Sequence, residues 1–483
     1  MMKLYIINHS FAYELENLTR AFFPNEKIRT VSEVELLEEP YVYTEVSEDK
    51  LTVKVSADGR IQEQSALAKE DDDKELILAT LLYNCLSEIS GRTLPWGLLT
   101  GVRPIKLFRK LADGNGRENA ENYFKNTLLV SDEKLELAKV TEANERKILE
   151  LSQKDSFSLY VSIPFCPSRC NYCSFVSQSV EKAKHLIKPY VNILVEEIKE
   201  TAKIAKDLNL RLETVYIGGG TPTTLSAEDL TKVLSAITES FDMTFVREFT
   251  VEAGRPDTIT EEKLKAIYDS GCDRISINPQ TLNDSVLEAI GRKHNTEEFI
   301  SSFNLARKIG FKHINTDLIA GLDTDTVESF KNTIDGILAL SPESVTIHTL
   351  SMKRSSFITA ENKLITENEN TSVSDMLSYG YDKLSKDGLR PYYLYRQSKM
   401  LGNLENTGWA KEGFDGLYNV YIMDETHTIL ACGAGAVTKL KAYGSEHLER
   451  IFNFKYPYEY IDRYSELSER KQAIYEFYKN YFM

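Results

Sequence analysis

Residues 158–175 read SLYVSIPFCPSRCNYCSF, an apolar strand that runs directly into a cysteine-rich loop. Cys166, Cys170 and Cys173 place three of the six cysteines of the chain within eight residues of one another. Cysteines spaced this closely in a long chain more often bind metal or act in redox chemistry than form disulfides. We therefore interpret the loop as a metal or cluster site, and we expect Cys85, Cys272 and Cys432 to be buried small apolar residues.

The pattern Cys-x3-Cys-x2-Cys favours an iron–sulfur cluster. Three thiolates on a four-iron cluster leave one iron open for a non-protein ligand, which is what S-adenosylmethionine requires. A structural zinc ion is the alternative, but such sites use four protein ligands, and the loop contains neither a His nor a fourth Cys. The nearest His, His185, lies in a predicted helix.

Strands and helices alternate downstream of the first strand, SLYVSIP (158–164). The further predicted strands are ETVYIGG (213–219), EFTVEA (248–253), RISINPQ (274–280), HINTDLIAG (313–321) and ESVTIHTL (343–350). Helical stretches separate them, with Thr260, Gly271 and Gly310 as predicted caps. Six βα units are too few for an eight-stranded barrel, so the pattern predicts an open partial (β/α)6 barrel, with its active face at the carboxyl ends of the strands.

Three domains are predicted in the α/β chain. Residues 1–150 form an N-terminal α/β domain that contains the strand KLYIINHS and two strands in PYVYTEV and KLTVKVSADGRI. The partial barrel occupies residues 151–370, and residues 371–483 form a C-terminal α+β extension. The stretch LPWGLLTGVRPIKLFRKL (94–111) combines Trp, Gly and Pro with basic residues, which is typical of a docking or lid segment.

The chain carries a net charge of −15, which disfavours nucleic acid and anionic lipid surfaces as partners. The N-terminus, MMKLYIINHSFAYELEN, lacks the unbroken apolar stretch of a secretory signal, and no later apolar run approaches the length of a membrane span. We therefore expect a cytoplasmic protein with no nucleic-acid partner and no membrane span.

The segments IPFCPSRCNYCSF and GGGTPT resemble the radical S-adenosylmethionine superfamily, specifically the oxygen-independent coproporphyrinogen III oxidase (coproporphyrinogen dehydrogenase) group. TVEAGRPD, RISINPQT, IGRKH, INTDLIAGL and CGAGAV continue the resemblance in order, over roughly residues 155–440. YYLYRQ, GNLENTGW and HTLSMKRSS are most similar to its HemZ-type branch. The resemblance implies a [4Fe–4S] cluster on the three cysteines, one or two molecules of S-adenosylmethionine, a tetrapyrrole substrate, a one-electron donor and an electron acceptor.

The resemblance also implies cofactor contacts near the cysteines. Tyr160 matches a tyrosine that contacts the cofactor, and Tyr172 lies where backbone contacts to the adenine are expected. Gly219, Gly220 and Thr221 match the site for the methionine amino group. Because glycine lets the backbone approach a ligand, we also expect N–H groups of this turn to bind the cofactor carboxylate.

Four polar residues on or after later strands are predicted to point into one mouth. The resemblance matches Glu252 and Arg292 with a cofactor carboxylate or ribose, and Gln280 and Asp317 with hydroxyl or amino groups. Taken singly, each is as readily a surface polar residue or part of a structural ion pair. Three further positions match places where the family packs the cofactor or a second copy of it: His348, Ala436 and Val437.

A tetrapyrrole with propionate arms needs cationic partners. The arginines that could face the mouth, each of which is alternatively a solvated surface charge, are Arg103, Arg169, Arg255, Arg354 and Arg396.

Two departures from the family pattern affect the function. Phe175 stands where the best-known oxidases carry a further Cys, and Gly402-Asn403 stands near where the heme-handling branch has a His-Asn-x-x-Tyr-Trp motif. The first hypothesis is an enzyme in which a 5′-deoxyadenosyl radical removes hydrogen from propionates of coproporphyrinogen III, so that decarboxylation leaves the vinyl groups of protoporphyrinogen IX. The alternatives are a heme-binding carrier of the same family and a radical enzyme that acts on another tetrapyrrole.

Overall fold

The computed structural model describes residues 1–34, 37–173, 175, 177–351, 367–397 and 400–482, without the side chains of 367–371. The chain forms two compact units. The smaller unit is built mainly from Met1–Lys139, and the later segment Tyr395–Glu405 returns to it. The larger unit contains most of the described chain from Val140 onward. The predicted division of the chain into three domains, with boundaries after residues 150 and 370, stays a proposal.

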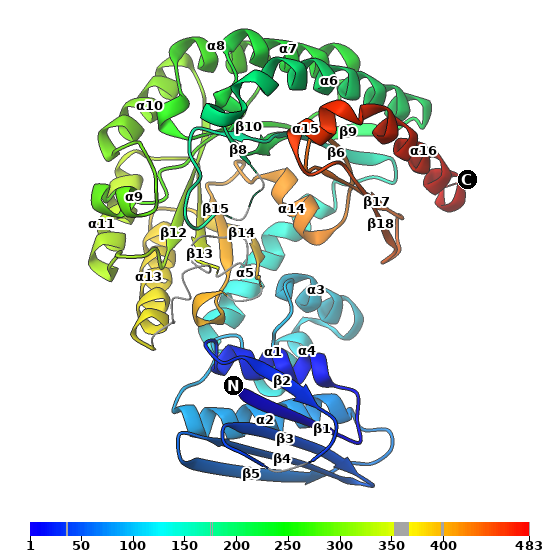
Figure 1. Ribbon diagram of the computed structural model, residues 1–483, viewed down its shortest axis with the longest axis vertical. Coiled ribbons are helices and arrows are strands. Elements are labelled where there is room, and N and C mark those ends of the chain that lie inside the picture. Colours follow the sequence, from blue (N-terminus) through cyan, green and yellow to red (C-terminus); the bar gives the residue numbers. More distant parts are fainter. Residues whose placement is uncertain (35–36, 174, 176, 352–366, 398–399, 483) are drawn as a thin grey trace. The chain divides into compact units, whose positions relative to one another are not determined.

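The smaller unit contains a five-stranded mixed sheet in the order β2-β1-β3-β4-β5. Its strands are β1 (Met2–Ile7), β2 (Ile28–Val31), β3 (Tyr41–Ser47), β4 (Lys50–Ala57) and β5 (Arg60–Leu67). Val53 and Val55 alternate with Thr52 and Lys54 along β4, so one face of the sheet is apolar. Leu18 of α1 (Ala12–Phe22) and Leu82 of α2 (Lys74–Ser90) share the buried core with these valines. Figure 1 shows both helices beside this sheet.

Shorter helices follow α2. They are α3 (Pro104–Asn115), α4 (Arg117–Asn122), a π-helical turn (Tyr123–Thr127) and α5 (Asp132–Leu149).

Buried polar contacts hold the returning segment in the smaller unit. The fully buried carboxylate of Glu405 accepts hydrogen bonds from Trp96 Nε1 and Lys134 Nζ, each at 2.7 Å. Arg396 Nη1 donates to the carbonyl oxygen of Leu99 at 2.5 Å. Trp96 and Leu99 belong to the predicted docking segment 94–111, whose first part is irregular and whose second part opens α3.

The larger unit is organised around an 11-stranded sheet in the order β14-β15-β13-β12-β11-β10-β9-β6-β16-β17-β18. The six strands predicted for the barrel are parallel neighbours in chain order, which confirms the partial (β/α)6 barrel. They are β6 (Ser156–Ile163), β9 (Arg211–Gly219), β10 (Glu248–Gly254), β11 (Arg274–Ile277), β12 (His313–Ala320) and β13 (Ser344–Thr349). Their residues are almost all buried, as expected for a parallel sheet covered by helices.

Strands from the C-terminal part extend both ends of this parallel sheet. At one end β16 (Thr428–Cys432) pairs in parallel with β6 and is followed by the antiparallel strands β17 (Val437–Lys441) and β18 (Leu448–Phe452). At the other end β15 (Asn406–Ala410) pairs antiparallel with β13, and β14 (Arg390–Tyr395) lies beyond it.

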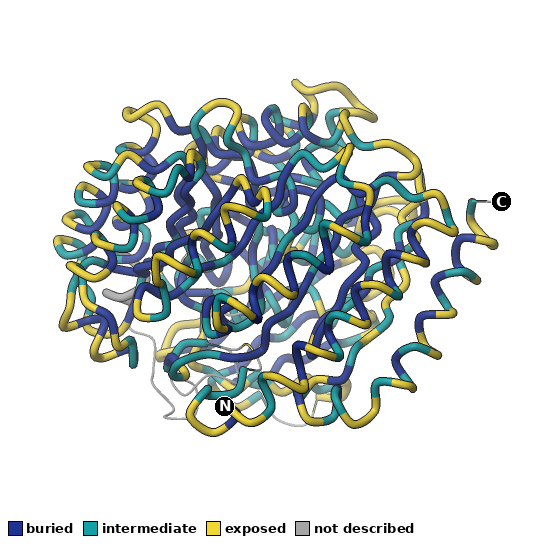
Figure 2. The backbone as a smooth tube through the Cα atoms, turned by 90° about the horizontal axis from the view of Figure 1, so that it is seen from above, coloured by how far each residue is buried: buried dark blue, intermediate teal, exposed yellow. Residues whose placement is uncertain are grey.

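Helices cover the outside of the barrel. They are α6 (Val180–Asp207), α7 (Ala227–Ser240), α8 (Glu261–Asp269), α9 (Asp284–Ala289), α10 (Thr296–Ile309), α11 (Val327–Ala339), α13 (Glu367–Lys386), α15 (Pro457–Asp462) and α16 (Tyr464–Tyr481), whereas α14 (Leu417–Asp424) lies on the inner side of the strands (Figure 1). Figure 2 shows these helices alternating between buried and exposed residues while the strands inside are almost wholly buried. No helix within the described ranges is long and apolar enough to cross a membrane.

The predicted helix ends are confirmed at three positions. The Thr260 side chain accepts a hydrogen bond from the Lys263 N–H at 3.3 Å and so caps α8. Gly271 and Gly310, which follow α8 and α10, have φ angles of +85° and +125°, in the region that favours glycine.

Candidate functional site

The three clustered cysteines lie on the loop that follows the carboxyl end of β6, as predicted. Cys166 belongs to the short strand β7 (Phe165–Cys166), which pairs in parallel with β8 (Gln178–Ser179). Cys170 and Cys173 lie on a turn in which the Cys173 N–H donates to the Cys170 carbonyl oxygen at 3.1 Å. The loop therefore opens on the face where βα barrels carry their active sites.

Two side chains from neighbouring strand ends point at the cysteine sulfurs. Thr221 Oγ1 lies 3.6 Å from Cys166 Sγ, and Arg255 Nη1 lies 3.8 Å from Cys170 Sγ. The same Arg255 nitrogen donates to Ser168 Oγ at 2.9 Å, within the loop. Hydrogen bonds directed at cysteine sulfurs are among the interactions by which proteins tune iron–sulfur clusters.

Burial raises the pKa of the Cys173 thiol, because removal from water disfavours the charged thiolate. Within the described part of the chain, no three His, Cys, Asp or Glu side chains converge as the ligands of a single metal ion would. In a four-iron cluster each thiolate binds a different iron, so the ligands need not converge on one point.

Gly219 and Gly220 form a tight turn at the end of β9, beside the start of the cysteine loop. Gly219 has a φ of +103°, and a Cβ atom added there would lie 2.7 Å from Ser162 Oγ. A Cβ atom on Gly220 would lie 2.6 Å from the Phe165 carbonyl oxygen. Only glycine allows this close approach of the two backbones.

The N–H groups of this turn have partners within the protein. The Gly220 N–H donates to the Ile163 carbonyl oxygen at 2.8 Å, and the Thr221 N–H donates to that of Phe165 at 2.7 Å. The expectation that these two groups bind a ligand carboxylate is therefore wrong. Both N–H groups already donate to backbone carbonyl oxygens, one at the end of β6 and one at the start of the cysteine loop.

Aromatic rings line the barrel interior below the turn. Tyr216 of β9 stacks against Tyr418 of α14 with ring centroids 4.5 Å apart, and Tyr160 of β6 lies 6.4 Å from the Tyr216 ring. The Tyr216 hydroxyl donates to Glu252 Oε1. Burial raises the pKa of Glu252 to about 7, although this hydrogen bond favours the carboxylate.

Tyr216 and Tyr418 were not predicted from the sequence. The first was detectable, because side chains alternate along a strand and Tyr216 lies two residues before Gly218, opposite Tyr160 in the register. Tyr418 comes from a distant helix, and no local pattern indicated it.

Asp317 and His348, on adjacent strands, form a second polar pair in the interior. His348 Nε2 lies 3.8 Å from Asp317 Oδ2, and Asn315 Nδ2 donates to Asp317 Oδ1 at 2.8 Å. Burial alone would raise the pKa of Asp317, but His348, Asn315 and the buried Arg274 hold it below its ordinary value. Asp317 is therefore a carboxylate at neutral pH, and it also contributes to the raised pKa of Glu252.

Gln280 links β11 to this pair through its backbone. Its N–H donates to the Asp317 carbonyl oxygen at 3.0 Å, and its own carbonyl oxygen accepts from the Ile319 N–H at 3.0 Å. Gln280 has a φ of +71°, which is costly for a residue with a Cβ atom and concentrates at functional sites.

Arg292 and Tyr172 form a separate pair beside the cysteines. Arg292 Nη2 donates to the Tyr172 hydroxyl at 2.9 Å, and Nη1 donates to the Asn278 carbonyl oxygen at 3.2 Å. The structure thus connects Arg292 to the cysteine loop.

Ala436 lies in the turn between β16 and β17, and Val437 begins β17, next to the end of β6. Ala436 is buried, and its N–H donates to the Gly433 carbonyl oxygen at 3.2 Å. Ser162 Oγ, which also faces Gly219, donates to the Ala434 carbonyl oxygen at 2.9 Å. Ser162 therefore lies between this turn and the glycine turn.

A buried carboxylate from α6 fixes the same turn. Glu197 Oε2 accepts from the Gly433 N–H at 2.7 Å and from the Tyr460 hydroxyl at 2.5 Å, and Glu197 Oε1 lies 3.0 Å from Lys471 Nζ. Glu197 and Lys471 were not predicted from the sequence, because their helices are far apart in it. Through them α15 and α16 support the strand that completes the sheet beside β6.

The arginines proposed to bind substrate propionates are placed differently from one another. Arg255 is buried and engaged with Asp257 and the cysteine loop, and Arg396 is buried and engaged with Leu99 and Asn403. Neither is therefore available for a propionate in this structure. Arg169 is exposed beside Cys170.

Arg103 is half-buried immediately before α3, in the smaller unit. Arg354 falls outside the described residues.

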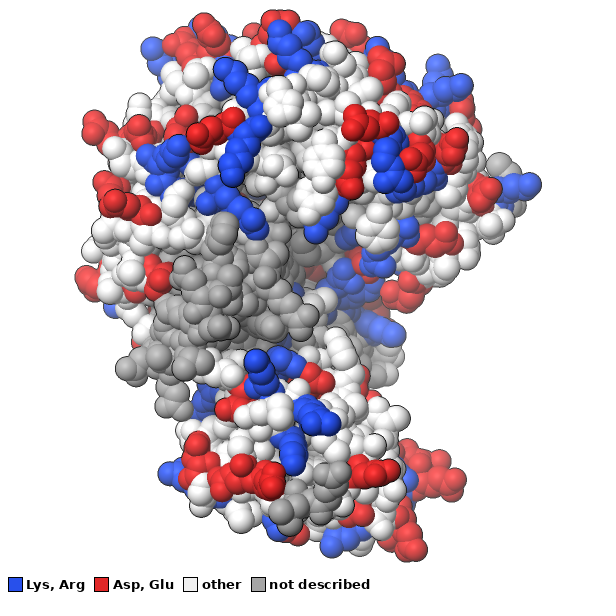
Figure 3. All heavy atoms as spheres, in the orientation of Figure 1, with Lys and Arg blue, Asp and Glu red and all other residues white. Residues whose placement is uncertain are grey.

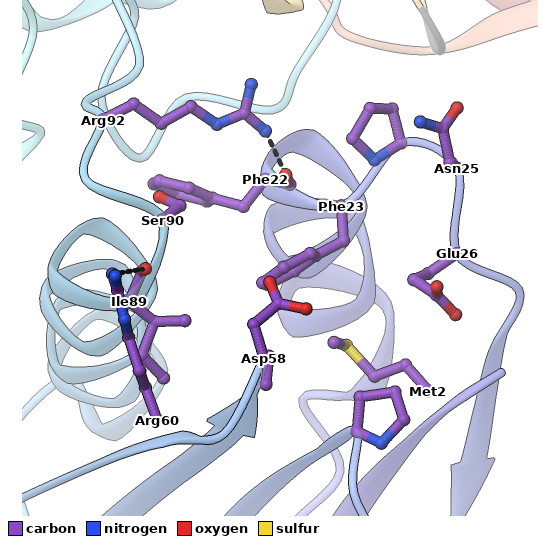
Figure 4. A pocket seen from close by; sticks show the side chains of 13 residues that line it. Met2, Phe22, Phe23, Asn25, Glu26, Asp58, Arg60, Ile89, Ser90 and Arg92 are labelled. Carbon is purple, nitrogen blue, oxygen red and sulfur yellow. Dashed lines mark hydrogen bonds between the residues drawn. The ribbon is translucent and has the colours of Figure 1, made fainter. Parts of the chain in front are cut away.

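The smaller unit has a pocket of its own, of about 530 Å³. Figure 4 shows Arg60 and Arg92 at this pocket together with Phe22, Phe23 and Asp58. Arg60 Nη1 donates to the Ile89 carbonyl oxygen at 3.2 Å, and Arg92 Nη2 donates to that of Phe22. Both arginines thus bind carbonyl groups at helix ends, and none of the predicted site residues lines this pocket.

Comparison with known proteins gives concordant results. A sequence model of the Radical SAM superfamily matches residues 160–337. The oxygen-independent coproporphyrinogen-III oxidase-like protein HemZ of Bacillus subtilis (strain 168) is 38% identical over 400 residues, which cover 82% of this chain and 79% of that protein. The heme chaperone HemW of Lactococcus lactis subsp. lactis (strain IL1403) is 32% identical over 302 residues, 62% of this chain and 73% of that protein.

A solved structure shares the fold. Coproporphyrinogen III oxidase (HemN) from Escherichia coli superposes with a TM-score of 0.53 at 22% identity, covering 67% of this chain and 72% of that chain.

Proposed function

The chain belongs to the radical S-adenosylmethionine superfamily, in the group of oxygen-independent coproporphyrinogen III oxidase-like proteins, and on that premise we propose that it oxidatively decarboxylates propionate side chains of coproporphyrinogen III to vinyl groups. The observation that carries the proposal is the cysteine loop at the carboxyl edge of the barrel, beside a glycine turn and a polar interior. Members of this superfamily use a [4Fe–4S] cluster and S-adenosylmethionine.

The residues of the loop fit a cluster. Cys166, Cys170 and Cys173 are its three protein ligands, and Arg255 orients the loop and donates toward the Cys170 sulfur. Hydrogen bonds to cluster sulfurs and the degree of solvent exposure set the reduction potential of such clusters. Arg255, which sequence analysis assigned to the substrate, is therefore proposed as a residue that tunes and positions the cluster.

The barrel mouth fits S-adenosylmethionine. The glycines at 219 and 220 let the end of β9 pack directly against the start of the cysteine loop, which we propose shapes the mouth that holds the cofactor. Because the N–H groups of Gly220 and Thr221 are used, this turn suits the methionine ammonium better than the carboxylate. Glu252 and Asp317 in the interior supply acceptors for amino and hydroxyl groups.

The remaining residues proposed to contact the cofactor lie around the mouth of the barrel or border residues that do. Tyr160 forms the wall of the mouth on β6, and Tyr172 with Arg292 forms the wall next to the cysteines. Gln280 and His348 border Asp317, while Ala436 and Val437 lie beside the end of β6.

The bound cofactors supply one-electron chemistry that removes a hydrogen atom from a propionate. The substrate then loses carbon dioxide and one further electron, which leaves a vinyl group, so the reaction also requires an electron acceptor. The role of the protein is to hold the C–H bond close to the cofactor and to exclude water and oxygen.

The proposal is tested on anaerobically reconstituted protein with dithionite, S-adenosylmethionine and coproporphyrinogen III. We expect 5′-deoxyadenosine and a vinyl-containing product from the wild type and from Cys85→Ala, whose cysteine is buried in the smaller unit. Cys173→Ala should lose the cluster absorbance and both products. A Cys173→Ala variant with undiminished cluster and turnover would overturn the assignment of the ligands.

A heme carrier is the second candidate, because heme chaperones are among the relatives. The sequence has Gly402-Asn403 where that branch carries its motif, and the Asn403 carbonyl oxygen is bound to Arg396 Nη2 at 2.8 Å. Stoichiometric heme binding without turnover of coproporphyrinogen III would favour the carrier. Cofactor cleavage with a different tetrapyrrole product would favour a radical enzyme with another substrate.

A further inference from the structure

We propose that the exposed surface around the cysteine loop, formed by Arg169, Phe175, Lys182, Lys184 and Lys293, is the docking surface for a small acidic one-electron carrier protein. The inference rests on the proposed function, because the cluster needs an electron from outside the protein. In this step the carrier loses one electron and the cluster gains it, with no bond made or broken.

Basic side chains surround the loop through short connections. Ser179 of β8 pairs with Cys166, and Lys182 and Lys184 follow on the first turns of α6. Arg169 precedes Cys170 directly, and Lys293 follows Arg292, whose guanidinium binds Tyr172. These basic residues are therefore anchored beside the cluster ligands.

The lysines of this surface are not neutralised within the described residues. Lys182, Lys184 and Lys293 are exposed, and no hydrogen bond or ion pair joins their side chains to a described residue. Glu181 and Glu288 are exposed in the same region, so the surface retains a net positive charge. Figure 3 shows Lys and Arg side chains in a band on this face of the larger unit, where Figure 1 labels β8.

This charge contrasts with the chain as a whole, which carries a net charge of −15. A positive surface on a negative protein attracts a negative partner to one place and repels it elsewhere. An acidic protein is thereby oriented so that its redox centre meets the cysteine loop. Electron-transfer partners commonly use small, salt-sensitive interfaces of this kind.

Phe175 provides an exposed apolar side chain on the cysteine loop itself. It lies two residues after Cys173 and is 63% exposed, which is unusual for a large aromatic side chain. Aromatic residues are enriched at the cores of protein interfaces, and a ring of charges around one is typical of a docking site.

The test is anaerobic stopped-flow reduction of the reconstituted full-length protein by a purified acidic flavodoxin in its hydroquinone form. The variant is Lys182→Glu/Lys184→Glu. The matched control is Lys203→Glu/Lys206→Glu, which makes the same charge change with exposed lysines roughly 30 Å further along α6. Reduction by the methyl viologen radical, a small cation that needs no docking surface, is measured in parallel.

We expect the second-order rate constant with flavodoxin to fall about tenfold or more in Lys182→Glu/Lys184→Glu at low salt, and to lose most of its dependence on ionic strength. The control should keep the wild-type rate and salt dependence, and methyl viologen should reduce all three proteins.

Equal slowing of both double variants, or no slowing of either, would overturn the docking surface. So would a wild type that methyl viologen reduces but flavodoxin does not. If methyl viologen supports cleavage of S-adenosylmethionine in every protein, these outcomes leave the proposed function standing. A protein that holds no cluster would overturn both.

Discussion

Glu252 shows how the barrel interior changes the pKa of a single side chain. Its carboxyl lies between Tyr216, which donates to it, and the negative charge of Asp317. Since burial outweighs the hydrogen bond, its pKa is raised to about 7. The protonation state of the candidate cofactor site therefore changes near neutral pH.

This shift predicts a pH-dependent stability that Glu252→Gln removes. The raised pKa means that the folded state binds a proton more tightly than the unfolded state, whose carboxyl has a pKa near 4.5. The wild type should thus lose stability relative to Glu252→Gln as pH rises from about 4.5 to about 7, by at most about 3 kcal/mol. Urea unfolding across this pH range measures the difference.

Glu288→Gln is the control, because Glu288 is exposed. Its unfolding free energy should run parallel to that of the wild type at every pH. A constant offset between wild type and Glu252→Gln over the range would contradict the raised pKa.

Gly219 provides a second prediction at the level of one residue. In Gly219→Ala the backbone is strained at φ +103°, and the added Cβ atom lies 2.7 Å from Ser162 Oγ. In Gly271→Ala the backbone is strained at φ +85°, but no atom lies within 4 Å of the added Cβ atom. We expect Gly219→Ala to weaken S-adenosylmethionine binding by about tenfold or more, roughly 1.4 kcal/mol, in equilibrium dialysis of the reconstituted protein. Gly271→Ala should bind as the wild type does. Equal binding by both variants would show that the turn does not shape the cofactor site.

The positions of some single residues could be predicted from strand alternation and from the spacing of the cysteines. That pattern predicted Cys166, Cys170, Cys173 and the position of Glu252 at a strand end. It could not show that Arg255 and Arg396 are buried, because their partners come from distant segments. The sequence alone does not distinguish an arginine that faces solvent from one that binds a substrate or a backbone carbonyl oxygen.

Secondary-structure elements of the barrel were predicted closely, since parallel strands are nearly continuous apolar runs between amphipathic helices. The pairing of β16 with β6 was not predicted, because it joins segments from opposite ends of the larger unit. The same holds for the contacts of α15 and α16 with α6, in which Tyr460 and Lys471 meet the buried Glu197.

Those helices yield a prediction about stability. Lys471→Met leaves the fully buried Glu197 without its cation, and removing one partner of a buried pair costs about 3–5 kcal/mol. Lys199→Met breaks an exposed pair with Glu196 on the same helix as Glu197 and should cost less than about 1 kcal/mol. Unfolding in urea compares the two variants, and similar losses would contradict a supporting role for the buried pair.

At the scale of the whole molecule, the smaller unit is completed by a segment from late in the chain. Glu405 in that segment accepts from Trp96 and Lys134, both from the first 139 residues. The N-terminal part therefore depends on the chain that follows the barrel.

Glu405→Ala tests this dependence. It leaves Lys134 buried without its main carboxylate partner, and we expect the smaller unit to lose about 3–5 kcal/mol. The chain has two tryptophans, so fluorescence of Trp96 in a Trp409→Phe background follows the smaller unit during urea unfolding. Glu133→Ala, which removes a more exposed contact to the same lysine, is the control. An unchanged Trp96 transition in Glu405→Ala would contradict the dependence.

The barrel is proposed to carry out radical chemistry on a tetrapyrrole propionate. The most direct measurement is the mass of the tetrapyrrole after strictly anaerobic turnover of the reconstituted protein with S-adenosylmethionine and coproporphyrinogen III. We expect a product that has lost one carbon dioxide and two hydrogens for each propionate converted, together with 5′-deoxyadenosine. Cleavage of S-adenosylmethionine with a tetrapyrrole of unchanged mass would contradict it.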